Sequence, residues 1–300
     1  MTFDAPLTIA GPFRAPMQML EDQTYDGQMS VHDDATADTL GLTGAPIEGP
    51  THFSQFDPIA HRLWGDDWFS SGCISAHFTT MVVEGEQVQA SVSHDGGHRA
   101  EITATKEDGS TVLTGSMSVA PHGETALEAR MAAARTPGDL FIIDQLTVGL
   151  RMEEDHPALV DATTPNGNLY PFSLARKLDG ITERSPYYDS PDNPWGRPIL
   201  PMEMLSVLAH KIGERLPIRR PSVGLFLDLE VRTEGTPVFV GEPYRVDREI
   251  VAISESRRVE SYWTRTTLTE ESSGRHCATV LLHSGVFKES YPGYPQDRLG

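Results

Sequence analysis

The sequence predicts an α+β protein made of two similar units, each an antiparallel sheet wrapped around a central helix. Three observations support this fold class. Proline and glycine are frequent, at 22 and 26 of 300 residues, as is typical of a strand-rich chain with many turns. A weak internal repeat relates the two halves. Each half also places one apolar segment of helical period before a run of segments with strand character.

The internal repeat consists of three short matches that occur in the same order in both halves. The offset between matched segments grows along the chain, as expected when the loops of the second copy are longer. Three ordered matches indicate duplication of one unit. The matched segments are 44–47 with 196–199, 82–86 with 238–242, and 109–113 with 274–278.

Each copy begins with an apolar helical segment that is followed by strands. In the first copy, Phe53, Phe56 and Ile59 lie on one face of this segment. Pro58 within it predicts a kink or a break, because proline cannot donate a hydrogen bond to the preceding turn. The expected helical segments are 51–63 and 202–216, and the expected strands are 74–83, 87–92, 99–106, 112–119, 223–231, 244–253, 259–269 and 276–286.

Helices this apolar must be buried, so we expect the strands of each copy to curl around the helix, which is the hotdog arrangement. The two copies would then pair edge to edge into one continuous sheet and form a pseudo-dimer in one chain, a double hotdog, which hides two sheet edges. We expect an N-terminal hotdog at residues 1–122, a helical linker at 123–139 and a C-terminal hotdog at 140–300. A loop inserted in the second unit, 161–192, is long enough to form a lid or to narrow a pocket.

Charge and cysteine content limit the partners and the compartment. A formal net charge of −19 would repel a phosphate backbone, so we expect no nucleic-acid partner. The first residues lack the pattern of a signal peptide, and no apolar run reaches about 18 residues, so we expect no membrane partner. The two cysteines, Cys73 and Cys277, are far apart and predict neither a disulfide framework nor a metal site, which favours a cytoplasmic location.

Two glycine-containing segments lead into the helical segments of the two halves: residues 37–47 (ADTLGLTGAPI) and residues 187–201 (YYDSPDNPWGRPILP). With the apolar positions that follow the first of them, they resemble the MaoC-like (R)-specific enoyl-CoA hydratases and dehydratases. The resemblance implies a double hotdog lyase that adds water to an enoyl thioester or removes it from the hydrated product. It implies no cofactor, since acyl-CoA would be the substrate, and it is compatible with a homodimer.

In that family an aspartate and a histidine in an Asp-x-Asn-Pro-x-His arrangement carry the chemistry, because a water must be deprotonated while a proton reaches the neighbouring carbon. The motif is altered in both halves of this chain. In the first half His32 is nearest the family histidine, and Asp26 is nearest the aspartate. Met29 and Ser30 stand at the Asn-Pro positions. The resemblance therefore makes His32 and Asp26 the predicted catalytic residues.

The start of the first helical segment is the predicted substrate-binding region. Backbone N–H groups at a helix N-terminus would stabilise the enolate-like thioester oxygen. Glu48 and Thr51 also suit helix capping, and Glu203 occupies the matching helix start in the second half. The predicted substrate-binding residues are Glu48, Gly49, Thr51 and His52, together with Glu183 and Tyr188, which overlay the altered motif in the second half.

Three functions are compatible with the sequence. The first is the acyl-thioester lyase. The second is a thioesterase of the same fold, in which Glu48 or Glu203 would activate water. The third is a non-enzymatic module that binds an acyl ligand, which the altered motif in both halves favours. Convergence of a carboxylate and a histidine near a helix start, at the seam between the two units, would favour an enzyme.

Overall fold

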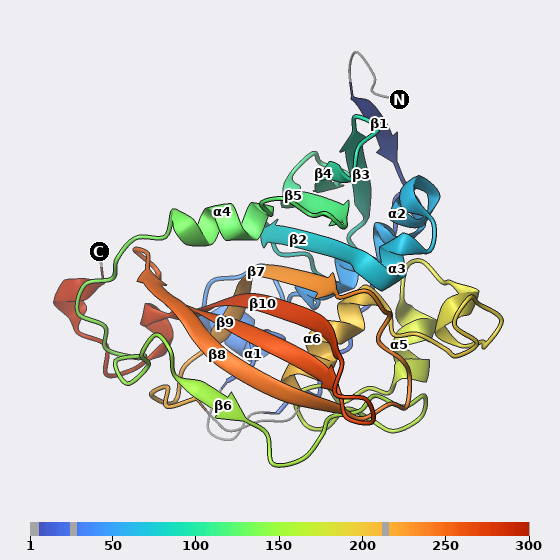
Figure 1. Ribbon diagram of the computed structural model, residues 1–300. Helices are drawn as coiled ribbons and strands as arrows, with labels where there is room; N and C mark the ends of the chain where they lie inside the picture. Colours follow the sequence, from blue (N-terminus) through green and yellow to red (C-terminus); the bar gives the residue numbers. More distant parts are fainter. Residues whose placement is uncertain (1–5, 25–28, 212–215, 300) are drawn as a thin grey trace.

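The computed structural model describes residues 6–24, 29–211 and 216–299, and its strands form one antiparallel sheet (Figure 1). In this part of the chain the sheet has ten strands in the order β1-β3-β4-β5-β2-β7-β10-β9-β8-β6. The strands are β1 (Leu7–Ala10), β2 (Gly72–Phe78), β3 (Val88–His94), β4 (Arg99–Lys106), β5 (Thr111–Val119), β6 (Arg151–Glu153), β7 (Gly224–Thr233), β8 (Tyr244–Glu255), β9 (Val259–Glu270) and β10 (His276–Phe287).

The strand order shows the internal repeat directly. Reading outward from the middle, β2-β5-β4-β3 in one half corresponds to β7-β10-β9-β8 in the other, and each half ends in a short edge strand. The two halves join where β2 pairs antiparallel with β7, with Cys73 opposite Arg232 and His77 opposite Asp228. The predicted pairing of the two units into one continuous sheet is therefore confirmed.

The helical segments differ between the two halves. In the first half, the single helix expected at 51–63 is divided into the 3-10 helix η1 (Gly49–Gln55) and the α-helix α2 (Asp57–Trp64). Pro58 lies in the first turn of α2, where its missing N–H costs no intrahelical hydrogen bond. In the second half, α6 (Met202–His210) is continuous, contacts η1, and packs on strands β7, β9 and β10.

The other helices are short and connect or cover the sheet. The segment that links the halves contains α4 (Ala126–Ala132), and Thr125 and Glu128 form a capping box at its start. Leu127 on α4 packs against Trp263 and Leu281 from the second half, so the linker crosses the seam between β2 and β7. The remaining helices are α1 (Asp34–Thr39), α3 (Asp67–Ser71), α5 (Leu174–Gly180), η2 (Pro186–Tyr188), η3 (Lys288–Ser290) and η4 (Gln296–Arg298).

A buried carboxylate fastens the seam on the face covered by α4. Asp228 on β7 accepts hydrogen bonds from Nδ1 of His77 on β2 (2.8 Å), Nε of Arg130 on α4 (2.8 Å) and Nδ1 of His283 on β10 (2.5 Å). Burial alone would raise the pKa of Asp228, but the hydrogen bonds from His283 and His77 outweigh it and hold this pKa well below its usual range. One side chain thus joins both halves and the linker.

No helix in the ranges described above is long and apolar enough to cross a membrane. The same residues contain no group of three or more His, Cys, Asp or Glu side chains placed to hold a metal ion. Cys73 and Cys277 are both buried free thiols.

Candidate functional site

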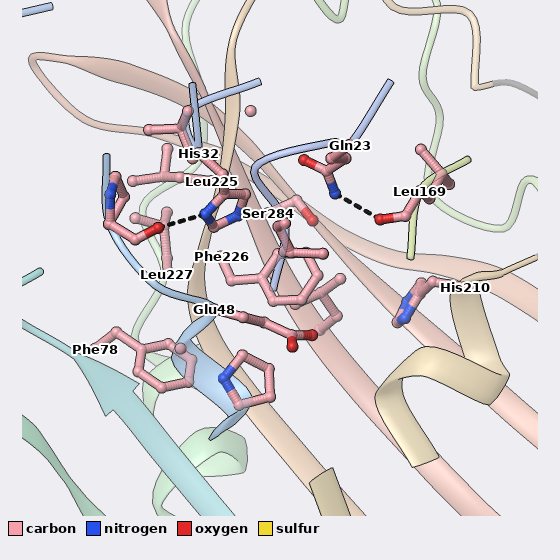
Figure 2. A pocket seen from close by; sticks show the side chains of 18 of the residues that line it. Gln23, His32, Glu48, Phe78, Leu169, His210, Leu225, Phe226, Leu227 and Ser284 are labelled. Carbon is pink, nitrogen blue, oxygen red and sulfur yellow. Dashed lines mark hydrogen bonds between the residues drawn. The ribbon is translucent and has the colours of Figure 1, made fainter. Parts of the chain in front are cut away.

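A cavity of about 630 Å³ lies at the seam between the two halves (Figure 2). Its first wall is the chain that leads into η1, and its opposite wall is formed by the start of β7, the end of β10 and the end of α6. Apolar side chains predominate on the β7 side. Among the lining residues are His32, Glu48, Gly49, His52, Phe78, His210, Leu225, Phe226 and Leu227.

His32 precedes α1 and faces this cavity. Its Nδ1 lies 2.6 Å from the carbonyl oxygen of Pro46, so Nδ1 carries the proton and Nε2 carries the lone pair. Burial lowers the pKa of His32, and the Pro46 carbonyl and the charge of Glu48 offset this only in part. At neutral pH the ring is therefore uncharged and can accept a proton at Nε2.

The loop that carries His32 is tied to the inserted loop of the second half. The backbone N–H of His32 donates to Oγ of Ser30 (3.1 Å), and Oγ of Ser30 donates to Oε1 of Gln23 (2.7 Å). Nε2 of Gln23 in turn donates to the carbonyl of Leu169 (2.8 Å; Figure 2). Asp26, the predicted partner of His32, lies outside the described residues.

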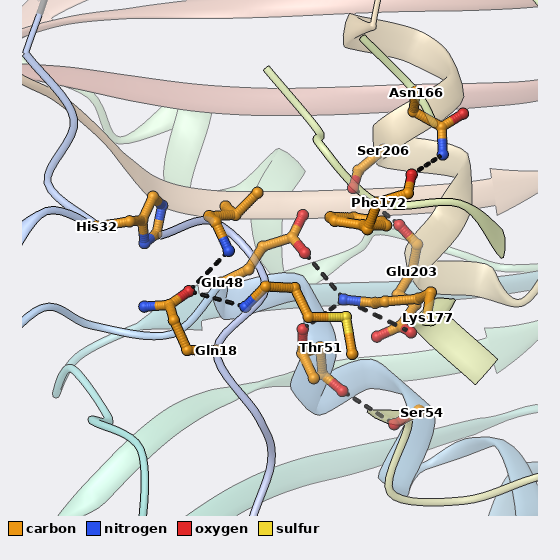
Figure 3. A network of polar contacts seen from close by, with 12 residues as sticks. Gln18, His32, Glu48, Thr51, Ser54, Asn166, Phe172, Lys177, Glu203 and Ser206 are labelled. Carbon is orange, nitrogen blue, oxygen red and sulfur yellow. Dashed lines mark hydrogen bonds and ion pairs between the residues drawn. The ribbon is translucent and has the colours of Figure 1, made fainter. Parts of the chain in front are cut away.

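A buried ionic network stands beside the cavity (Figure 3). Nζ of Lys177, from α5, donates to Oε2 of Glu48 (2.9 Å) and to Oγ1 of Thr51 (2.7 Å), and it lies 3.9 Å from Oε1 of Glu203. Burial would lower the pKa of Lys177, but Glu203 and Glu48 outweigh it, so the pKa is raised and the ammonium stays charged. Thr51 therefore belongs to this network. It is not among the described residues that line the cavity.

The carboxyl group of Glu203 is the least satisfied member of this network. Its side chain is 1% exposed, and neither oxygen has a hydrogen-bond partner among the described residues. Burial raises its pKa to about 8, against the attraction of Lys177, so Glu203 is mostly protonated at neutral pH. Burial, with Lys177 and Lys106 nearby, lowers the pKa of His52 to about 4, so that ring is neutral.

Glu183 and Tyr188, predicted to bind substrate, lie away from the cavity in the described structure. Glu183 forms an ion pair with Nε of Arg14 (2.6 Å). The hydroxyl of Tyr188 donates to Oδ2 of Asp57 (2.6 Å), whose Oδ1 accepts from Nε1 of Trp68 (2.9 Å). Burial raises the pKa of Asp57 to about 6, although these two donors oppose the shift.

In the sequence overlay of the two halves, Tyr188 takes the motif position that His32 takes in the first half. The contacts at the two positions differ: the ring of His32 donates to the carbonyl of Pro46, whereas beside Tyr188 the backbone N–H of Ile199 donates to the carbonyl of Tyr187 (2.8 Å). The side chain of Tyr188 is fully buried and packs edge-to-face on an aromatic ring of α3. The two halves therefore differ, with an open cavity at one position and a packed aromatic side chain at the other.

Two residues of this region were missed in the sequence. Lys177 carried a usable signal: it lies on the same helical face as Leu174 and Leu178, so an apolar stripe contains a single cation. His210 is the last residue of α6, far from the helix start where the site was expected. No pattern in the sequence distinguished it.

Comparison with solved structures identifies the architecture. A protein described as a MaoC domain dehydratase from Chloroflexus aurantiacus superposes with a TM-score of 0.58 over 95% of each chain, at 12% identity. A conserved hypothetical protein from Mycobacterium tuberculosis with a double hotdog fold gives 0.57 at 11% identity, over 95% of this chain and 97% of that one. This chain has the double hotdog fold. A MaoC-like dehydratase gives 0.51 over 96% of each chain, at 14% identity.

The sequence comparisons add no closer relative. No family model matches the sequence, and a search of curated proteins finds no match. The likeness to MaoC-like dehydratases is therefore a likeness of fold, and the chemistry has to be argued from the residues of the cavity.

Proposed function

We propose that this double hotdog protein is a lyase that adds water to an enoyl thioester, or removes water from a 3-hydroxyacyl thioester, with His32 as the acid-base group. The observation that carries the proposal is the state of His32. It is a half-buried, neutral imidazole whose Nδ1 is fixed by Pro46, so that Nε2 is left as the base on a cavity between the two halves.

In the hydration direction, Nε2 of His32 accepts a proton from water while the water oxygen bonds to C3 of the enoyl group. The electrons of the double bond move onto the thioester, and the resulting enolate takes at C2 the proton that Nε2 of His32 has just accepted, which returns the imidazole to its neutral form. Gly49 begins η1 and lines the cavity, so its N–H is our candidate donor to the enolate oxygen. A Cβ at this position would lie 3.1 Å from the Phe78 ring, so a larger residue here would require that ring to move. Asp26 remains the predicted partner of His32.

The other predicted binding residues divide into two groups under this proposal. Glu48 and His52 line the cavity, so they would contact the acyl group or its thioester. Thr51 would act indirectly, by holding Lys177 against Glu48. Glu183 and Tyr188 would support the fold of the second half, since both are engaged by other side chains. No cofactor is required for this reaction, and assembly into a homodimer remains a prediction.

The proposal can be tested with purified protein and crotonyl-CoA, hexenoyl-CoA and branched enoyl-CoA substrates, followed by mass spectrometry of the hydrated product. Loss of one general base typically lowers the rate by about 10²- to 10⁴-fold, so we expect a loss of that size in His32→Ala. His61→Ala is the matched control, because His61 lies on α2, contacts Asp66 and is 41% exposed. Absence of hydration by the native protein, or an unchanged rate in His32→Ala, contradicts the proposal.

A thioesterase is the second candidate, and one observation favours it. Oε1 of Glu48 is buried without a hydrogen-bond partner among the described residues, while Oε2 is held by Lys177. A carboxylate placed in this way could activate water toward a thioester carbonyl. Release of free CoA from acyl-CoA, measured with a thiol reagent, distinguishes this reaction from hydration. Binding of acyl-CoA without either reaction would favour the third function, a non-enzymatic module that binds an acyl ligand.

A further inference from the structure

The cavity contains a second histidine, contributed by the other half of the chain. His210 is the last residue of α6, and its ring projects from the helix end toward the cavity (Figure 2). Nδ1 lies 2.7 Å from the carbonyl oxygen of Ser206, one turn earlier, so it donates its proton there. Nε2 is buried and has no hydrogen-bond partner in the described parts of the chain.

The protonation state of His210 restricts what it can bind. Burial lowers its pKa, and the Ser206 carbonyl opposes this only in part, so the ring is neutral at pH 7. With the proton fixed on Nδ1, Nε2 can only accept a hydrogen bond. The guanidinium of Arg248 lies close by, but it donates to the carbonyl of Ala209 (3.0 Å from Nε, 2.5 Å from Nη2) and pairs with Glu154.

The surroundings of Nε2 of His210 favour a hydrogen-bond donor that comes from a bound ligand. The ring of His210 lies 6.1 Å from that of Phe226, which faces the same cavity. A buried acceptor without a partner is destabilising, and native proteins rarely retain one. The carboxylate of Glu48, which projects into the same space, also offers an unpartnered acceptor oxygen (Figure 2). This cavity therefore suits a ligand that brings its own O–H donor.

We propose that His210 is a specificity-determining residue whose Nε2 accepts a hydrogen bond from a hydroxyl group on the acyl chain. The protein then prefers acyl thioesters with a hydroxyl group remote from the reacting carbons over unsubstituted chains of the same length. The inference rests on the acyl-thioester ligand of the proposed function. It adds to that function the chemical class of the acyl group, which carries a hydroxyl.

Saturated thioesters test the preference without the hydration step. Calorimetric titration with hexanoyl-CoA and with 4-, 5- and 6-hydroxyhexanoyl-CoA gives four affinities for the native protein. We expect at least one hydroxylated ligand to bind about tenfold more tightly than hexanoyl-CoA, as one buried hydrogen bond typically provides. His210→Leu should abolish this ratio, whereas His210→Gln, which retains an acceptor near the position of Nε2, should keep most of it.

The outcomes separate this inference from the proposed function. Binding of all four thioesters with no preference, or an unchanged preference in a folded His210→Leu protein, overturns the inference alone. If His210→Leu does not fold, His210→Phe, which keeps a planar ring without an acceptor, takes its place, and an unchanged preference in that variant overturns the inference. Failure of all four to bind contradicts the acyl-thioester ligand itself and removes both proposals together.

Discussion

Replacement of Glu203 by glutamine should change how the stability of the protein depends on pH. The ordinary pKa of this carboxyl group is 4.5, and in the folded protein it is about 8. Between these two values the unfolded chain has lost the proton and the folded protein has kept it. The folded state then binds more protons than the unfolded state, so the free energy of unfolding falls as pH rises through this window.

The size of the effect follows from the two pKa values. Each pH unit inside the window costs about 1.4 kcal/mol, so moving from pH 4.5 to pH 7 costs roughly 3 kcal/mol. The side chain is 1% exposed, so little solvent screening reduces this figure. Glutamine has no proton to lose. The difference in unfolding free energy, Glu203→Gln minus native, should therefore rise by roughly 3 kcal/mol between pH 4.5 and pH 7 and level off above about pH 8.

Urea denaturation at half-unit pH steps measures this difference, because ionisations shared by the two proteins cancel. Glu84→Gln supplies the background, since Glu84 lies exposed in a turn. A difference curve for Glu203→Gln that stays flat within about 0.5 kcal/mol from pH 4.5 to pH 8 would refute the reasoning, because Glu203 would then be ionised in the folded protein.

Three further predictions concern the same residues and the seam. Lys177→Met should lower the unfolding free energy by about 3 to 5 kcal/mol, because it leaves a buried carboxylate unpaired; recovery of stability in the Lys177→Met, Glu48→Gln double variant is the check. Asp228→Asn should cost about 3 kcal/mol in denaturant titration and weaken the seam, and an unchanged midpoint contradicts that role. The hydration rate should rise with pH through a pKa below 6.5 and then level off, since burial lowers the pKa of His32; a pH profile that falls over this range contradicts its role as base.

Much of the fold could be predicted because the strands carry strong local signals. Alternation of apolar and polar residues placed one strand at 259–269, and β9 is observed at Val259–Glu270. Pairing of the two units followed from the need to hide sheet edges. Pro58 indicated a break in the first helical segment, but no local pattern indicated that η1 would be a 3-10 helix or that it would contact α6.

The candidate site was predictable only in part. Residues close to the start of the first helical segment were expected to gather, and His32, Glu48, Gly49 and His52 do line one cavity. Lys177 lies 129 positions from Glu48 in the sequence, so their contact depends on how α5 packs against η1. Burial itself sets the protonation of Glu203, and burial is a property of the tertiary structure.

The packing of Tyr188 against Asp57 has a consequence for stoichiometry. Of the two positions that the sequence overlay relates, His32 lines a cavity and Tyr188 is buried against Asp57 in the described structure. The cavity also takes its walls from both halves, so neither half alone would form it. One polypeptide should accordingly bind a single equivalent of ligand at saturation. The second copy of the unit would then contribute lining residues to that one cavity and no second site.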